Sequence, residues 1–283
     1  MTQPPNDPLP EPAEWLGATA VKQCRHGCFR FFRQDVYVGR SLELYGEFSE
    51  SEVALFGQLL KPGAVVVEAG ANIGALTVPI ARLVGPRGRV IAYEPQLPVA
   101  DLLARNVAAN ALTTVDVRCA ALGAHLSTIS VPRLDYRRSG NFGGVALGGE
   151  AGERIAVETI DSLGLERVDL IKVDVEGMEV EVLTGGAATI GTRRPVLYVE
   201  NDRAEHSRQL IATLEGFGYR AWWHFAGLFN PANFFGNPEN VFPSMMSVNL
   251  LCFPREWSMT VTDGIPVLGP DDDWESARRR ALP

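Results

Sequence analysis

Hydrophobic and polar residues follow two alternating periods along the chain from residue 64 onward. Short runs of almost continuous Val, Ile and Leu predict buried strands, and segments with apolar residues at every third or fourth position predict helices. Strands of this composition are covered by helices on both faces, as in a parallel sheet. The pattern predicts a doubly wound α/β sheet with its ligand at the C-terminal ends of the strands. The expected strands cover residues 64–70, 89–95, 113–122, 168–177, 194–202 and 245–253, with one more ending at His224.

The segment before this alternation has a different pattern. Residues 28–48 alternate apolar and polar positions in places and are bounded by glycine, which predicts short strands or a hairpin. Ser49 is followed by Glu52 three positions later and by apolar residues at helical spacing. This arrangement predicts a helix with a capping box that ends before residues 62–63, a Pro-Gly pair.

We expect four parts in the chain. Residues 1–27 begin with five prolines in the first twelve positions and predict a disordered or loosely attached arm. Residues 28–60 should form strands and a helix that pack on the core, and residues 61–255 the main domain. Residues 256–283 form a tail that pairs an acidic with a basic cluster, as in a solvated helix or in an oligomer contact such as that of a homodimer.

Composition narrows the classes of function. The 26 Lys and Arg residues against 34 Asp and Glu residues give a formal net charge of −8, which disfavours nucleic acid or an anionic membrane as the main partner. No apolar run reaches the roughly 18 to 20 residues that cross a bilayer, and the N-terminus lacks a secretory pattern. We therefore expect a cytoplasmic protein. Four scattered cysteines do not indicate a disulfide framework.

The turn after the first predicted strand of the main domain, EAGANIG (residues 68–74), is the first candidate for chemistry. Gly70 allows a sharp turn and close approach of a ligand, and Gly74 allows the following helix to pack closely on the strand. A dinucleotide fingerprint needs further glycines where Asn72 and Ala75 stand, and no Gly-Lys-Ser/Thr follows for a P-loop. The turn is therefore not built for a diphosphate.

Two acids beside this turn indicate its ligand. Glu94 ends the second strand, 20 residues after Gly74, where an acid accepts hydrogen bonds from both hydroxyls of a ribose. Glu68 adds a negative charge, which suits a cationic ligand with an amino group and opposes a diphosphate. An adenosine ligand with a ribose, a positive centre and no diphosphate is S-adenosylmethionine.

Two other classes stay open on the residues alone. A nicotinamide (NAD)-dependent oxidoreductase uses a similar sheet, although the missing glycines and Glu68 count against it. A non-catalytic cofactor-binding protein could keep the turn and lose the chemistry. The acids at Asp174 and Glu176 count against that reading.

An ordered set of motifs resembles a known family. The stretches VVVEAGANIG, VIAYEP, TIDSL, IKVDVEGMEVEVLTGG and FGNPENVFPSMMSVNLLCFP are similar to those of the FkbM-type S-adenosylmethionine-dependent methyltransferases, over about residues 38–255. The resemblance implies a Rossmann-like class I methyltransferase fold, with a mostly parallel seven-stranded sheet and helices on both faces. It also implies O-methylation, mostly at hydroxyl oxygens of sugars, glycans and secondary metabolites.

The resemblance assigns cofactor roles by position. It implies that the turn residues line the methionine part of the cofactor, that Glu94 holds the ribose, and that Ala120 and Ala121 contact the adenine edge or are small core residues. Glu47 could reach the cofactor, be solvated or cap a helix. The residues assigned to the methionine part are Glu68, Gly70, Asn72 and Gly74.

Catalytic candidates follow from the needs of methyl transfer to an alcohol, which is a poor nucleophile until a base or a metal removes its proton. Asp174 and Glu176 stand at the C-terminal end of the fourth strand, and His224 opens a loop rich in aromatic residues. Any of them could be the base without a metal. Alternatively, Asp174 with Glu200 and Asn201 could form an all-oxygen site for Mg²⁺, as in related metal-dependent sugar methyltransferases.

Overall fold

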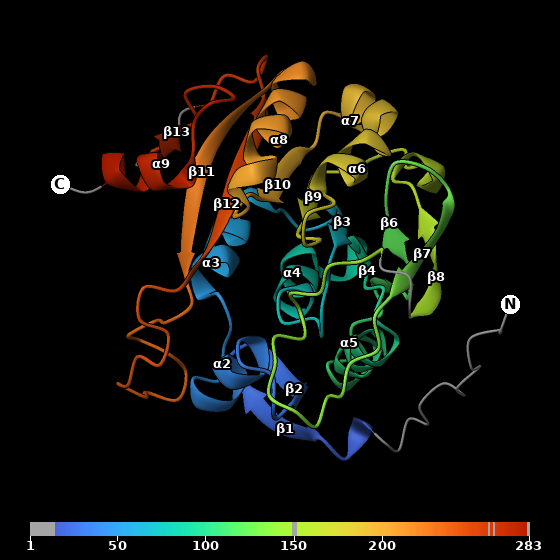
Figure 1. Cartoon of the computed structure of the whole chain (residues 1–283), viewed down its shortest axis with the longest axis vertical. Coiled ribbons are helices and arrows are strands. Elements are labelled where there is room, and N and C mark those ends of the chain that lie inside the picture. The colour runs from blue at the N-terminus through green and yellow to red at the C-terminus, as the bar shows by residue number, and fades with distance from the viewer. Residues whose placement is uncertain (1–14, 149–151, 260, 263, 282–283) are drawn as a thin grey trace, which may run out of the picture.

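A central eight-stranded sheet organises the protein (Figure 1). The computed structural model describes residues 15–148, 152–259, 261–262 and 264–281. From one edge to the other the strands lie in the order β5, β4, β3, β9, β10, β12, β11, β13. Their bounds are β3 Val65–Ala69, β4 Arg89–Tyr93, β5 Val115–Arg118, β9 Leu170–Val173, β10 Val196–Glu200, β11 Tyr219–Gly227, β12 Met246–Pro254 and β13 Ile265–Pro266.

The sheet confirms the predicted doubly wound class. Strands β5, β4, β3, β9 and β10 pair in parallel, and β12 inserts antiparallel between β10 and β11. The chain order reverses at β3 and β9, so the loops after these two strands open on the same edge of the sheet. Seven strands match the expected Rossmann-like sheet, and the two-residue β13 adds an eighth from the predicted tail.

Helices cover both faces, and the strand residues alternate between two cores. Val66 packs with α3 (Glu50–Leu59) and α4 (Thr77–Val84), whereas the next residue, Val67, packs on the opposite face. That face carries α6 (Glu179–Thr184), α7 (Ala187–Arg193) and α8 (Ala204–Gly216). Because alternate strand residues share a face, Glu68 and Lys172 point with Val66 toward α3 and α4. The single helix expected over residues 178–190 is divided into the two short helices α6 and α7.

The N-terminal region corrects two expectations. Residues 19–27 do not belong to a loose arm, because β1 (Thr19–Cys24) pairs antiparallel with β2 (Gly27–Phe32). Residues 1–14 of the expected arm lie outside the described residues. Residues 38–44 form helix α2 (Val38–Leu44) instead of a strand, because the Asp35 carboxylate accepts backbone N–H bonds from Tyr37 and Gly39 and starts a helical turn.

The helix expected after Ser49 is present as α3, but its predicted capping box is not. The Ser49 hydroxyl donates to the Glu52 carboxylate instead of accepting from the backbone, and Ser49 itself lies in the left-handed region with φ of 46°. Glu52 is turned into the protein interior, where it is 3% exposed. A surface capping pair is thus replaced by a buried carboxylate.

The remaining elements are a small three-stranded sheet and the helices α5 and α9. A small sheet of β6 (Ala121–Leu122), β7 (Ser127–Val131) and β8 (Glu153–Glu158) follows β5, so the strand expected over 113–122 is divided in two. Helix α5 (Leu97–Ala109) packs against β2, and α9 (Trp274–Ala281) lies beside β13. Within the described chain, no helix is long and apolar enough to cross a membrane.

The buried Asn106 side chain on α5 connects the N-terminal hairpin to the main domain. Its Oδ1 accepts from the Arg30 backbone N–H at 2.7 Å, and its Nδ2 donates to the carbonyls of Arg30 at 2.9 Å and Ile73 at 2.8 Å. We predict that Asn106→Ala lowers the free energy of unfolding by about 3 kcal/mol, because it leaves buried backbone groups without partners. Urea denaturation measures the change. Arg105→Ala, at the neighbouring exposed position, should cost less than about 1 kcal/mol, and equal losses in both variants would contradict this role of Asn106.

Candidate active site

The glycine turn between β3 and α4 is held tightly against two neighbouring strands. The N–H groups of Gly70 and Ala71 both donate to the Tyr93 carbonyl at the end of β4, at 3.0 and 2.9 Å. Gly70 has φ of +81°, and a Cβ atom there would lie 1.7 Å from the Asp174 carbonyl oxygen. Only glycine fits, as the sequence predicted. At Gly74 a Cβ atom would lie 2.7 Å from the Leu103 side chain, so the close approach at this position is to α5 and not, as expected, between the following helix and the strand.

Glu94 lies beside the turn with both carboxylate oxygens in use. Oε2 accepts the backbone N–H of Asn72 at 3.0 Å, and Oε1 accepts that of Gln96 at 2.9 Å. Burial raises the pKa of Glu94 to about 7, although the two N–H bonds favour its charge. Each oxygen retains a second lone pair for a ligand.

Glu68 is buried behind the turn. Its Oε2 accepts the Thr77 hydroxyl at 2.7 Å, whereas its buried Oε1 has no partner. Burial raises the pKa of Glu68 to about 7, an effect that the nearby Lys172 ammonium group reduces. An unpartnered carboxylate oxygen at the wall of a cavity is suited to a cationic hydrogen-bond donor.

Lys172 is a site residue that the sequence reasoning missed. Its side chain is buried and its Nζ lies 3.1 Å from Asp174 Oδ2. Burial opposes its charge, but the carboxylates of Asp174, Glu68 and Glu52 together raise the pKa of Lys172. A lysine in the middle of a run of apolar strand residues was the available signal, because a buried ammonium group needs charged partners.

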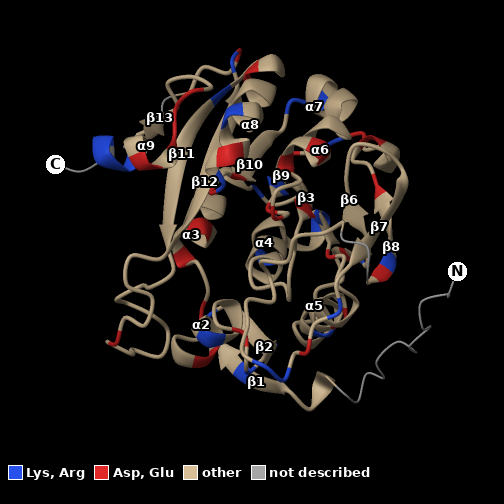
Figure 2. Ribbon diagram, viewed as in Figure 1, with Lys and Arg blue, Asp and Glu red and all other residues tan. Residues whose placement is uncertain are grey.

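Three carboxylates gather where β9 and β10 end. One oxygen from each of Asp174, Glu176 and Glu200 lies within 4.8 Å of the others, and Figure 2 shows acidic residues in this part of the molecule. Burial and the charge of Asp174 raise the pKa of Glu176 to about 7, despite its ion pair with Arg203. The same two causes raise the pKa of Glu200, whose buried Oε2 has no hydrogen-bond partner.

Two adjoining cavities contain these groups. The larger has a volume of about 510 Å³ and is lined by the glycine turn, Glu68, Glu94, Lys172 and the carboxylate cluster. The smaller, about 40 Å³, shares Gly70, Glu94 and Asp174 with the larger and extends to Ala120 and Ala121. The cofactor residues expected from the sequence thus line these two adjoining cavities, apart from Gly74, which lines neither.

Other candidates lie elsewhere. His224 lines neither cavity. Its Nδ1 is 2.7 Å from the Tyr198 hydroxyl, and burial lowers its pKa. The buried Asn201 also lines neither cavity, and its side-chain amide donates to the Ser207 hydroxyl on α8 at 2.9 Å. In the cluster with Asp174 and Glu200, the third residue is therefore Glu176 and not the expected Asn201. Glu47 also lines neither cavity, and its carboxylate instead forms an ion pair with Arg25, with Nε and Oε2 2.6 Å apart.

A family model matches more than half of the chain, and two curated relatives match parts of it. Residues 68–221, more than half of the chain, match the model of the methyltransferase FkbM domain. The chain is 29% identical over 191 residues to the AMB antimetabolite synthetase AmbE of Pseudomonas aeruginosa, covering 52% of this chain and 9% of that protein. It is 29% identical over 154 residues to the methyltransferase sdnD of Sordaria araneosa, covering 42% and 59%. The chain thus spans less than two thirds of either relative.

Solved structures give more distant matches. A methyltransferase FkbM from Methylobacillus flagellatus matches with a TM-score of 0.42 and 16% identity, covering 71% of this chain and 50% of that chain. An S-adenosylmethionine-dependent O-methyltransferase from Thermotoga maritima matches with a TM-score of 0.45 and 14% identity, covering 74% and 67%.

The raised pKa of Glu94 makes the stability of the ligand-free protein depend on pH. A carboxyl group with a higher pKa in the folded than in the unfolded state favours folding at low pH, and this contribution is lost as pH rises through the folded value. For a shift from 4.5 to about 7, the free energy of unfolding should fall by about 2 kcal/mol between about pH 5.5 and about pH 8.

Urea denaturation across this pH range measures the effect. Glu94→Gln should remove that part of the slope, whereas Glu275→Gln, at an exposed position on α9, should leave the slope unchanged. Equal slopes in the wild type and Glu94→Gln would show that Glu94 is not held in a desolvated environment.

Proposed function

The chain belongs to the FkbM methyltransferase family, and on that premise we propose that it transfers the methyl group of S-adenosylmethionine to a hydroxyl oxygen of a sugar, a glycan or a secondary metabolite. The observation that carries the proposal is the cavity of about 510 Å³, in which the glycine turn and its two buried acids face a cluster of three carboxylates. One side has the chemistry to hold the cofactor, and the other has the chemistry to remove a proton.

The cofactor is proposed to lie across both cavities. The free lone pairs of Glu94 would accept the ribose hydroxyls, and Glu68 Oε1 would accept from the amino group of the methionine part. The smaller cavity, with Ala120 and Ala121, would receive the adenine edge. A nicotinamide dinucleotide is disfavoured because both acids would lie close to its diphosphate.

The walls of the larger cavity support a division between cofactor and acceptor. Every carboxylate that lines it belongs to residues 68–221, the part that matches the family model. Outside that part the wall is mostly apolar or carries hydroxyl groups, with Arg278 as its one charged residue among those described. This composition favours a hydroxylated acceptor with an apolar body. The outer wall consists of Tyr37, Val38, Phe48, Leu228, residues 244–248, Trp274 and Arg278.

The reaction requires a base near the acceptor hydroxyl. The hydroxyl oxygen attacks the methyl carbon, the carbon–sulfur bond breaks, and its electron pair stays on sulfur to give S-adenosylhomocysteine. The hydroxyl proton passes to a carboxylate of the cluster. Burial and the charge of Asp174 raise the pKa of both Glu176 and Glu200, and the pKa of about 7 at Glu176 suits a proton acceptor near neutral pH. Asp174, fixed by Lys172, orients the hydroxyl.

A divalent cation is a second route at the same place. Asp174, Glu176 and Glu200 offer the oxygen ligands that Mg²⁺ prefers, and Glu200 Oε2 has no other partner. When bound there, the ion would lower the pKa of a hydroxyl that contacts it. Turnover that persists after dialysis against EDTA would support the carboxylate base alone. Loss of turnover with recovery on adding Mg²⁺ would support the cation.

We predict that Glu94→Ala weakens the binding of S-adenosylmethionine by about 1 to 3 kcal/mol, because the ribose loses its charge-assisted hydrogen bonds. Calorimetric titration with S-adenosylmethionine, S-adenosylhomocysteine and NAD measures this directly. The wild type should bind the first two and not NAD. An unchanged dissociation constant in Glu94→Ala would remove Glu94 from the cofactor site, and binding of NAD alone would favour an oxidoreductase.

We predict that Asp174→Asn lowers turnover at least about 100-fold, because the central carboxylate of the cluster is lost. Cofactor affinity should change by less than about threefold, since Glu68 and Glu94 are intact. The assay follows formation of S-adenosylhomocysteine with a panel of hydroxylated acceptors, with Glu176→Gln and Glu200→Gln tested beside it. Full activity in Asp174→Asn would show that Asp174 is not needed to orient the acceptor hydroxyl, and cofactor binding without turnover of any acceptor would favour a non-catalytic protein.

A further inference from the structure

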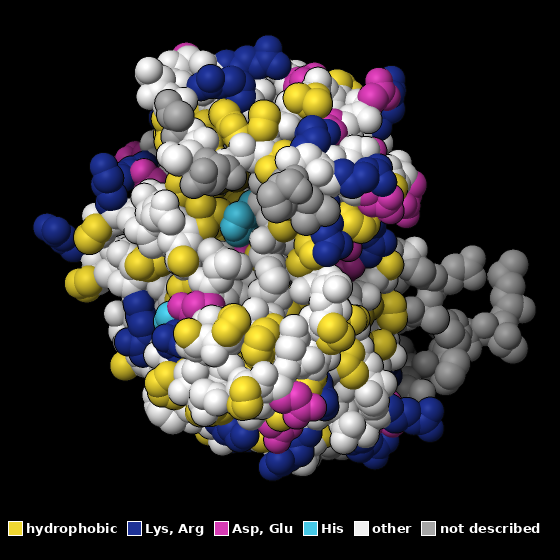
Figure 3. Space-filling view, turned by 90° about the vertical axis from the view of Figure 1, so that its left-hand side faces the viewer, with side chains coloured by type: hydrophobic (Ala, Val, Ile, Leu, Met, Phe, Trp, Pro, Cys, Tyr) yellow, Lys and Arg dark blue, Asp and Glu magenta, His cyan; other side chains and the backbone are white. Residues whose placement is uncertain are grey.

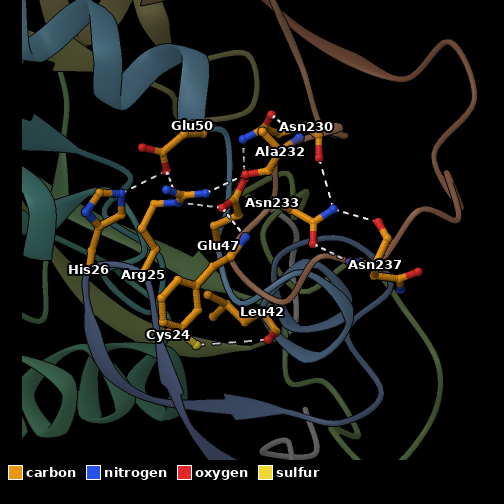
Figure 4. Close-up of polar contacts among 11 residues, drawn as sticks. Cys24, Arg25, His26, Leu42, Glu47, Glu50, Asn230, Ala232, Asn233 and Asn237 are labelled. Carbon is orange, nitrogen blue, oxygen red and sulfur yellow. Dashed lines mark hydrogen bonds and ion pairs between the residues drawn. The ribbon is translucent and has the colours of Figure 1, made fainter.

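A buried carboxylate outside the cavities connects the N-terminal hairpin to the loop between β11 and β12. Glu47, 5% exposed, lies between the β1–β2 hairpin and the β11–β12 loop, residues 228–245 (Figure 4). Its Oε2 accepts from Arg25 Nε at 2.6 Å and from the Phe234 backbone N–H at 2.9 Å. Its Oε1 accepts from Asn230 Nδ2 at 2.7 Å. Arg25 in turn donates to the Ala232 carbonyl at 2.7 Å, so the loop is bonded to both members of the ion pair.

The neighbours of Glu47 hold the same loop at further points. The Tyr45 hydroxyl donates to the Glu239 carbonyl at 2.8 Å and accepts the Val241 N–H at 2.9 Å, while the Phe235 N–H donates to the Tyr45 carbonyl at 3.1 Å. Between them, Gly46 has φ of +67°, and a Cβ atom there would lie 2.8 Å from the Phe235 ring. Residues 45–47 thus fit closely against the loop.

The loop depends on these contacts for its shape. Residues 228–245 contain no helix or strand, and a segment of this length without secondary structure is held by its tertiary contacts. Its ends, Leu228 and Met245, line the larger cavity, and so does Phe48, the residue after Glu47. Figure 3 shows the molecule from the side of β11 and α9, where few charged side chains cover the centre of the face.

We propose that Glu47 is a positioning residue for the methyl acceptor. Its carboxylate clamps the β11–β12 loop against residues 45–48 and so fixes the distance between Phe48 and the loop residues Leu228 and Met245. This role rests on the proposed function, because the three side chains belong to the wall assigned to the acceptor. Glu47 itself touches neither cavity and therefore acts through the wall.

The carboxylate is suited to this task because three separate donors converge on it. Without it, the Arg25 guanidinium, the Asn230 amide and the Phe234 N–H would all lose their common partner, and unpaired polar groups at a half-buried site favour opening toward water. Glu50 provides a matched comparison. It contacts His26 at 2.8 Å and Arg25 at 3.7 Å but makes no hydrogen bond or ion pair with the described residues of the loop.

The first measurement is hydrogen exchange of the loop amides in the full-length protein without ligand. In Glu47→Ala, exchange of the Phe234 and Phe235 amides should be at least about tenfold faster than in the wild type, since one lost hydrogen bond is worth about that factor. Asn230→Ala, which keeps the Arg25–Glu47 ion pair, should give a smaller increase and serves if Glu47→Ala does not fold. Glu50→Ala should leave the loop unchanged. Equal exchange rates in the wild type, Glu47→Ala and Asn230→Ala would overturn the proposal that Glu47 holds the loop.

The second measurement separates positioning from stability alone. Using the acceptor of the hydroxylated panel that the wild type methylates fastest, Asn230→Ala and Glu47→Gln should raise KM at least about tenfold and change kcat and the dissociation constant of S-adenosylmethionine by less than about threefold. An unchanged KM with a faster-exchanging loop would overturn the positioning role. A wild type that binds no S-adenosylmethionine would instead refute the proposed function, while the exchange result would still decide the clamp.

Discussion

The ion pair between the buried Lys172 and the partly exposed Asp174 is the interaction on which the site depends. The Lys172 ammonium group lies in the layer between β9, α3 and α4. There only nearby carboxylates can compensate its positive charge. Asp174 meets it at the edge of the sheet, and Glu68 and Glu52 approach it from β3 and α3. One positive charge therefore fixes the relative position of three carboxylates, and with them the positions of β3 and α3 relative to the lysine strand.

The glycine turn and this charged layer constrain each other. Gly70 has no room for a side chain because the Asp174 carbonyl lies against it, so the path of the turn and the end of β9 are fixed together. Glu68 reaches back under the turn to Thr77 at the start of α4. The glycine turn is thus held by β4, β9 and α4 together, while the outer wall of the larger cavity is assembled from segments that are distant in sequence.

How far the sequence predicts the site depends on whether the local chain decides a residue's position. Gly70 and Glu94 follow buried strands directly, and their placement was predictable because parallel strands bring their ends to one edge. The hydrogen-bond partner of Asn201 is 6 residues away in the chain, and that of His224 is 26 residues away. Glu47 has a partner 187 residues away, and no local pattern reveals such contacts. Helix α2 was missed because an apolar–polar alternation favours a strand until the Asp35 side chain redirects the backbone. The eighth strand was too short for any periodicity.

The outer wall of the larger cavity has an evolutionary consequence. It takes its residues from before and after the 68–221 region, whereas the carboxylates and the glycine turn lie inside that region. Substitutions in the outer wall can therefore alter the molecules that the cavity admits without replacing any of the carboxylates that line it. On the proposed function, the choice of acceptor and the chemistry of methyl transfer would be set by different parts of the chain, so that one could change while the other is kept.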